Sequence, residues 1–302
     1  MQPSRRAFLL GRRPVQTPWA TFLQRLALRC QGTVRDQGGL PGQAPRAVLA
    51  PLREADVVHA RALCAEYGVV LALADAEGPF APAAGALLRV DPGRLAGLAR
   101  LAGAAPRWRA QPGVPLAALA QAGLRQFDGL PGAMTLAQWL AAPAPWAAGD
   151  CAASGVLGVD LLLADGVEES LGPFGADDVQ PLRSATVQRL VPALFQLAGG
   201  ELAAACRGAD RWQARYRLDA LAPRAPAGVN LAHLLLGHGG TLAWVRSVTL
   251  AAAPAPGSAR AESGEGGAWP SHAIALQARI KALFDPHGRF PALAAGPDGD
   301  NL

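Results

Sequence analysis

Apolar and polar positions alternate after residue 45 in a way that predicts a strand, a helix and a second strand. Residues 47–50 form a short apolar run that ends at Pro51. Residues 54–67 carry Val57, Val58, Ala62 and Leu63 at helical spacing, and residues 69–73 are again apolar. Gly68 stands between this helix pattern and the second strand, a position at which helices favour glycine. The pattern therefore predicts a strand–helix–strand unit here.

Shorter elements follow along the chain. Strands are predicted at residues 86–90, 106–110, 158–163 and 167–171, and helices at residues 115–122 and 135–140. Asp165 and Gly166 separate the last two strands, and Asp-Gly supplies the positive φ that a tight hairpin needs. Because the alternating pattern gives way to hairpins, an α+β fold with two sub-layers is favoured over a doubly wound sheet.

The two ends of the chain differ from its centre. Residues 1–45 read as an arm with one amphipathic helix at residues 19–28 and a Gly/Pro-rich linker. Residues 46–254 form the predicted main domain, with lobes at about 46–105 and 106–254. Residues 255–268 are a Gly- and Ser-containing linker, and residues 269–302 a helix with a tail.

Composition excludes several classes of protein. The chain has 302 residues, is 51% hydrophobic and 17% charged, and is therefore globular. Its net charge of +5 comes from scattered arginines with a single lysine, Lys281, so no basic stripe for nucleic acid is present. Cys30, Cys64, Cys151 and Cys206 lie far apart without a C-x-x-C pair, which favours buried thiols in a reducing compartment over a metal site.

The N-terminus resembles a twin-arginine export motif at residues 4–10. Residues 11–14, Gly-Arg-Arg-Pro, follow instead of an apolar segment with a cleavage site. We therefore predict a structural or partner-docking arm and a cytoplasmic protein, with export as the alternative. No run of about 18 apolar residues occurs, so no membrane span is expected.

Residues 230–254 read as a short apolar helix, a glycine-rich turn and a strand. Three glycines in the turn, Gly237, Gly239 and Gly240, indicate a backbone that needs positive φ or close approach to another group. His238 lies between them. We interpret it as a surface turn histidine, with an acid/base role as the alternative.

Five blocks, in order, resemble the FAD-linked oxidase family, the vanillyl-alcohol-oxidase-like flavoproteins with a PCMH-type FAD-binding domain. The glycine turn resembles the family's G-S-E-G-T-L-G segment through Gly237, Gly240, Thr241 and Leu242. The C-terminal block, from Arg279 to Phe290, resembles the family's R-I-K-x-x-F-D-P-x-G-I-F ending and is the most specific match. The blocks are residues 45–70, 86–123, 161–174, 230–249 and 279–290.

The resemblance implies a two-lobed PCMH-type fold, with a small β-α-β lobe and a larger lobe of mixed or antiparallel sheet flanked by helices. FAD would lie between the lobes, and noncovalently, because the phosphate loop contains no histidine. The resemblance places the phosphates and the flavin ring near these residues: Ala74, Asp75, Ala76, Glu77, Gly78, Thr135, Leu136, Trp244 and Val245. It assigns no catalytic residue.

The departures from the family fall on the cofactor contacts. The phosphate loop of the family is glycine-rich, so that backbone N–H groups reach the pyrophosphate. Here Pro79 removes a donor, and Asp75 and Glu77 place negative charge near a dianionic ligand. Ala137 and Gln138 replace a Gly-Gly pair, and only the 255–268 linker stands where the family has a cap domain.

Two functions follow. The leading one, by resemblance, is an FAD-binding oxidoreductase or the FAD-binding subunit of a 2-hydroxy-acid dehydrogenase or oxidase complex, which implies a small 2-hydroxy acid substrate and a redox partner subunit. The second is a degenerate, flavin-free member of the family that acts as a scaffold or accessory subunit. The altered phosphate loop and the short linker favour the second, and the retained order of blocks is compatible with both.

Overall fold

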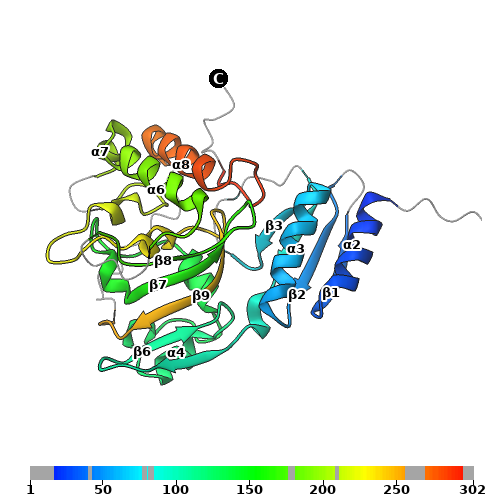
Figure 1. The fold of residues 1–302 in the computed structure, drawn as a ribbon, viewed down its shortest axis with the longest axis horizontal. Helices are drawn as coiled ribbons and strands as arrows, with labels where there is room; N and C mark the ends of the chain where they lie inside the picture. The colour runs from blue at the N-terminus through cyan, green and yellow to red at the C-terminus, as the bar shows by residue number, and fades with distance from the viewer. Residues whose placement is uncertain are drawn as a thin grey trace, which may run out of the picture.

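The computed structural model describes residues 17–39, 43–76, 80, 85–175, 181–207, 211–255 and 269–294. Two β-sheets lie side by side, each with its own helices (Figure 1). The predicted α+β class and the division into two lobes are confirmed. Residues 1–16 of the predicted N-terminal arm and residues 256–268 of the linker lie outside the described residues.

The small lobe contains a four-stranded sheet in the order β1-β2-β4-β3. Its strands are β1 (Thr33–Gly38), β2 (Arg46–Ala50), β3 (Val70–Leu73) and β4 (Leu87–Val90). Strands β2, β4 and β3 are parallel, and α3 (Glu54–Tyr67) connects β2 to β3. Gly68 ends α3 at φ 65°, so the strand–helix–strand unit predicted from the apolar pattern is confirmed.

The N-terminal helix and β1 are part of this lobe. Helix α2 (Pro18–Arg29) begins after Thr17, whose side chain caps it, and buries Phe22 and Leu26 beside α3. Strand β1 pairs antiparallel with β2. It is polar and mostly exposed, an edge strand without an apolar alternation, and the sequence pattern does not predict it.

The large lobe contains a five-stranded antiparallel sheet in the order β5-β6-β9-β7-β8. Its strands are β5 (Leu98–Leu101), β6 (Arg107–Ala110), β7 (Val156–Leu162), β8 (Glu168–Leu171) and β9 (Trp244–Ala251). The predicted β7–β8 hairpin is present, with Gly166 at φ 89° in its turn. Strand β5, which the pattern does not predict, forms one edge.

Helices flank the large sheet (Figure 1). They are α4 (Leu116–Gln121), α5 (Leu136–Ala141), α6 (Ala185–Ala198), α7 (Glu201–Cys206) and α8 (Ser271–Phe284). Helices α6, α7 and α8 lie together on the side of β8, and α4 lies beside β6. Short 3₁₀ turns lie at η1 (Pro92–Arg94), η2 (Arg125–Phe127), η3 (Cys151–Ser154), η4 (Leu218–Leu221) and η5 (Leu231–Leu235). No helix in the described part of the chain is both long and apolar enough to span a bilayer.

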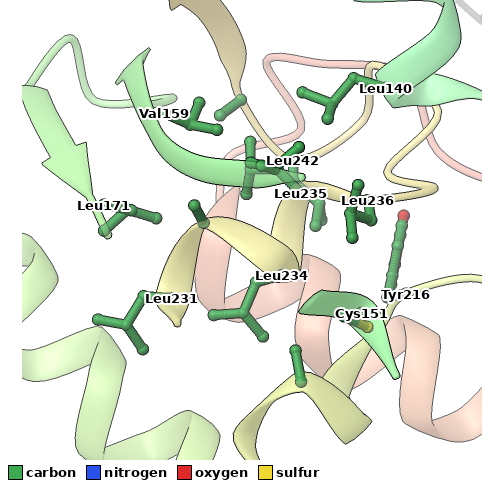
Figure 2. Close-up of a cluster of buried hydrophobic side chains, with 14 of the residues drawn as sticks. Leu140, Cys151, Val159, Leu171, Tyr216, Leu231, Leu234, Leu235, Leu236 and Leu242 are labelled. Atoms are coloured by element: carbon green, nitrogen blue, oxygen red, sulfur yellow. The ribbon is translucent and has the colours of Figure 1, made fainter. Parts of the chain in front are cut away.

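The core of the large lobe explains the apolar run before the glycine turn. Leu231, Leu234 and Leu235 project from η5 into a cluster with side chains of the sheet, and Leu236 and Leu242 flank the turn in the same cluster (Figure 2). All five leucines are buried. Their burial fixes where the turn begins and ends, and so positions the residues between them.

Candidate functional site

The two lobes meet where β3, the start of β9 and the glycine turn (residues 237–241) come together. Gly237, Gly239 and Gly240 have φ of 78°, 65° and 70°, so the predicted need for positive φ is confirmed. Close approach is present as well, because a Cβ on Gly240 would lie 3.1 Å from the Cβ of Leu73 on β3. Glycine is therefore required here both for conformation and for contact between the lobes.

A buried polar network holds the turn. The Arg215 guanidinium donates to the carbonyls of Gly237 and Ala141, each at 2.9 Å. The Tyr216 hydroxyl lies 2.7 Å from Oγ1 of Thr241, and Lys281 Nζ donates to the Thr241 carbonyl at 2.7 Å. Burial raises the pKa of Tyr216 to about 12, so the phenol stays neutral. The turn is thus fixed by elements distant in sequence.

His238 is buried, with 2% of its surface exposed, and the interpretation as a surface histidine is wrong. Its Nδ1 accepts a hydrogen bond from the Gly240 N–H at 3.1 Å. Its Nε2 has no hydrogen-bond partner among the described residues. Burial, assisted by the nearby Arg215 charge, lowers the pKa of His238 to about 3, so the imidazole is neutral near pH 7.

The segment after α8, the C-terminal strap (residues 285–293), joins the lobes. The Asp285 carboxylate accepts from the backbone N–H groups of Arg289 and Phe290, each at 2.8 Å, and from Lys281 Nζ at 2.5 Å. The Leu71 N–H on β3 donates to the Arg289 carbonyl at 2.9 Å. The strap is therefore anchored on the large lobe and hydrogen-bonded to the edge of the small sheet.

Further polar contacts join the two lobes beyond the glycine turn and the C-terminal strap. Arg246 of β9 forms an ion pair with Glu54 of α3 at 2.8 Å, and Gln111 donates to the same carboxylate at 3.1 Å. The Arg61 Nε of α3 donates to the Ala164 carbonyl in the β7–β8 turn at 3.0 Å. These contacts hold the lobes in one relative position.

Apolar side chains fill the space between the lobes. The buried cluster of the small lobe continues into the large lobe through Ala137, Ala141, Leu162, Ala164, Trp244 and Phe290. The cavity that remains has a volume of about 10 Å³. It is lined by Leu71, Leu73, Ala137, His238, Gly240, Ala243, Trp244, Val245 and Phe290. This is space for about one water molecule, whereas pockets for organic ligands measure about 300–1,000 Å³.

The residues at this interface do not fit FAD. The side chain of Ala137 lines the interlobe cavity, where the family resemblance implies bare backbone against the cofactor, and the side chain of Leu73 lines the same cavity. Asp75, at φ 54°, lies in the segment from Ala74 to Gly78 that the resemblance assigns to the phosphates, and its carboxylate is a poor neighbour for a dianion. We therefore derive no reaction step through a flavin.

The structure brings together only some of the residues assigned from the sequence. Trp244 and Val245 line the cavity, and Ala74 is buried directly after Leu73. Thr135 caps α5 through Gln138, and Leu136 is buried in the large-lobe core. Asp75 and Ala76 follow Ala74 at the end of β3, and Glu77 and Gly78 lie outside the described residues.

Comparisons with known proteins give distant structural likeness alone. No protein-family model matches the chain. No curated protein matches it either. A solvent-stable cholesterol oxidase is 18% identical, with a TM-score of 0.41 over 75% of this chain and 38% of that one. The carbohydrate oxidase of Microdochium nivale is 14% identical, with a TM-score of 0.43 over 78% of this chain and 44% of that one.

A third similar structure is the glucooligosaccharide oxidase of Acremonium strictum, which shows a novel flavinylation. It is 12% identical, with a TM-score of 0.44 over 78% of this chain and 43% of that one. All three are oxidases, the class of protein that the sequence resemblance names. This chain spans less than half the length of each. Such loose likeness assigns no cofactor, so the chemistry must come from the residues of this chain.

Several interface residues are not assigned from the sequence. Apolar runs of the sequence predict buried core positions, and three interface residues lie in such runs: Leu73, Ala137 and Phe290. The apolar pattern does not indicate that these side chains face another lobe. Lys281 and Asp285 lie in the C-terminal block that carries the most specific resemblance. The match of that block is the feature of the sequence from which the strap could have been predicted. No group of three or more metal-ligating side chains occurs within the described ranges.

Proposed function

We propose that this chain is a flavin-free protein built on the two-lobed architecture of FAD-linked oxidases, and that it acts as a scaffold or accessory subunit. The closed interface between the lobes carries this proposal. The region that would hold the flavin ring is a continuous apolar core with a cavity of about 10 Å³. Burial of Leu73, Trp244 and Phe290 stabilises the closed form by about 1.5–3 kcal/mol for each large side chain.

The polar contacts support the same proposal. The Glu54–Arg246 ion pair, the Leu71–Arg289 hydrogen bond and the Asp285 carboxylate all form when the lobes are closed. FAD binding would have to break part of this set and re-expose the apolar core to water. The opposing proposal, an FAD-binding oxidoreductase or the FAD subunit of a 2-hydroxy-acid dehydrogenase, draws on the sequence resemblance and requires parted lobes.

The absorbance spectrum of the purified protein tests the proposal. We expect a colourless protein without flavin bands when it is expressed in a host supplied with riboflavin, because the closed interface gives the ring no volume. A flavoprotein oxidase purified from the same host serves as the positive control. Flavin bands that persist through gel filtration, at close to one flavin per chain, would overturn it.

A further inference from the structure

His238 titrates on the atom that accepts the N–H of Gly240, the turn residue next to Leu73 of the small lobe. Because Nδ1 accepts the Gly240 N–H, the proton of the neutral imidazole sits on Nε2. The next proton must therefore go to Nδ1. A protonated Nδ1 would face the Gly240 N–H with a second donor at 3.1 Å, and that hydrogen bond would be lost.

Gly240 transmits this loss to the small lobe. Its Cα stands against Leu73 so closely that an added Cβ would lie 3.1 Å from the Leu73 Cβ. A shift of Gly240 away from Leu73 would open this contact between the lobes. The neutral imidazole and the closed interface are thus coupled through one residue.

The charged groups around His238 would not stabilise the positive imidazolium that a second proton creates. The Arg215 guanidinium, from the segment before η4, is a cation beside the turn. Lys281 and Asp285 of α8 and the strap are paired with each other, and Asp285 also accepts two backbone N–H groups. Tyr216 is a neutral phenol. The cavity residues from β3, α5 and β9, such as Leu71, Ala137 and Trp244, carry no charge.

We propose that His238 is an acid-operated lock: the lobes close only while its imidazole is neutral, and protonation of Nδ1 opens them. Opening separates Leu73 on β3 from Gly240 and exposes the apolar faces of β3 and the start of β9. The lock is independent of any flavin and goes beyond the proposed accessory role, since it concerns when the interlobe surface becomes accessible.

The direction of the pH effect follows from linkage. The pKa of His238 is about 3 in the closed form and 6.5 for an imidazole in water. The open form therefore binds more protons between these two values, and closure is fully present above pH 6.5. Each unit of pH below 6.5 shifts the equilibrium tenfold toward the open form, until the pKa of the closed form is reached.

Hydrogen exchange of the Leu71 amide tests the lock, because this amide bonds to the strap across the interface. In the wild type, the opening constant, corrected for the intrinsic exchange rate, should rise about 50-fold from pH 6.5 to 4.5. Amides in the β7–β9 ladder exchange through global unfolding, which also frees His238, so their opening constants should be smaller than that of Leu71 at each pH. A flat Leu71 profile, or Leu71 opening constants equal to those of the ladder, would overturn the proposal.

Two histidine variants separate the lock from general acid sensitivity. His238→Gln keeps an acceptor for the Gly240 N–H but does not titrate, and its Leu71 profile should be flat. His233→Gln is the matched control. His233 is also buried, with Nε2 2.9 Å from the Val156 carbonyl inside the large lobe, and its loss should leave the Leu71 slope unchanged. A slope retained in His238→Gln, or lost in His233→Gln, contradicts the lock.

A measurement on the wild type alone covers the case in which His238→Gln does not fold. With ¹⁵N-labelled histidine, His238 should show the neutral Nε2–H tautomer throughout pH 4.5–6.5, because the closed form binds the second proton only near pH 3. A closed form that carries the proton on Nδ1, or a His238 signal that titrates near pH 6.5 while Leu71 stays protected, would overturn the lock.

Discussion

At the scale of single residues, a few buried polar groups fix the junctions between elements of this molecule. Asp56 is the clearest case in the small lobe. Its carboxylate is fully buried and accepts backbone N–H groups of Gln31 and Gly32 at 3.0 Å and of Leu52 at 2.9 Å. One side chain therefore ties the end of α2 to the start of α3, and β1 begins immediately after that tie.

Asp56→Asn should lower the free energy of unfolding by about 1.5–3 kcal/mol near pH 7, because an amide presents N–H donors to backbone donors. Burial raises the pKa of Asp56, but hydrogen bonds from Gln31, Leu52 and Arg53 outweigh it, and the pKa lies below the ordinary 3.8. A lowered carboxyl pKa adds stability above 3.8 that is lost as pH falls through the folded value.

Urea unfolding at several pH values measures both effects. Asp36→Asn is the control, since Asp36 is exposed and accepts from a neighbouring Gly38 N–H, and it should change stability by less than about 0.5 kcal/mol. Equal losses in the two variants would show that Asp56 does not organise the α2–α3 junction.

At the scale of elements, the glycine turn and the C-terminal strap fix the relation between the lobes. The turn brings backbone against Leu73, and the strap bonds Leu71 on the same strand. Both are anchored on α8 through Lys281, which donates to the carbonyls of Thr241 and Phe290. Strand β3 is thus held from two directions by the large lobe.

Gly240→Ala should lower the free energy of unfolding by more than the cost of placing alanine at a positive φ. Gly129→Ala is the matched control, because Gly129 has φ of 75° and an added Cβ there would meet nothing within 4 Å, whereas at Gly240 it would meet Leu73 at 3.1 Å. The left-handed conformation costs alanine about 1–2 kcal/mol at both sites. Contact with Leu73 should add about 1–3 kcal/mol at Gly240 only.

A double-mutant cycle with Leu73→Ala isolates this contact. Removal of the Leu73 side chain should cost less in the Gly240→Ala background than in the wild type, with a coupling of at least about 0.5 kcal/mol in thermal or urea unfolding. Additive effects of the two substitutions would mean that the turn and β3 do not press against each other.

At the scale of the whole molecule, local patterns predict the elements but not the space between them. The unit from β2 to β3 follows from its apolar runs and from Gly68, and the β7–β8 hairpin follows from Asp165 and Gly166. Strands β1 and β5 pair with the next strand along the chain, but as edge strands they contain no buried residue, so their local sequence lacks the apolar alternation that predicts a strand.

In the candidate site, too, the sequence predicts the local backbone but not the long-range packing. The glycines of the turn indicate their positive φ in the sequence, because only glycine adopts it readily. The burial of His238 does not show there, since it depends on Leu73, Trp244 and Phe290, which come from β3, β9 and the strap. The filled interface is a long-range property, and sequence reasoning reaches it only as far as the altered phosphate loop and the replaced Gly-Gly pair.

The claim that the interface excludes FAD is tested most directly by equilibrium dialysis of the purified protein against FAD at neutral pH. We predict equal concentrations of FAD on the two sides of the membrane, because the closed lobes leave a cavity of about 10 Å³. An excess of FAD with the protein that saturates near one molecule per chain would contradict the account.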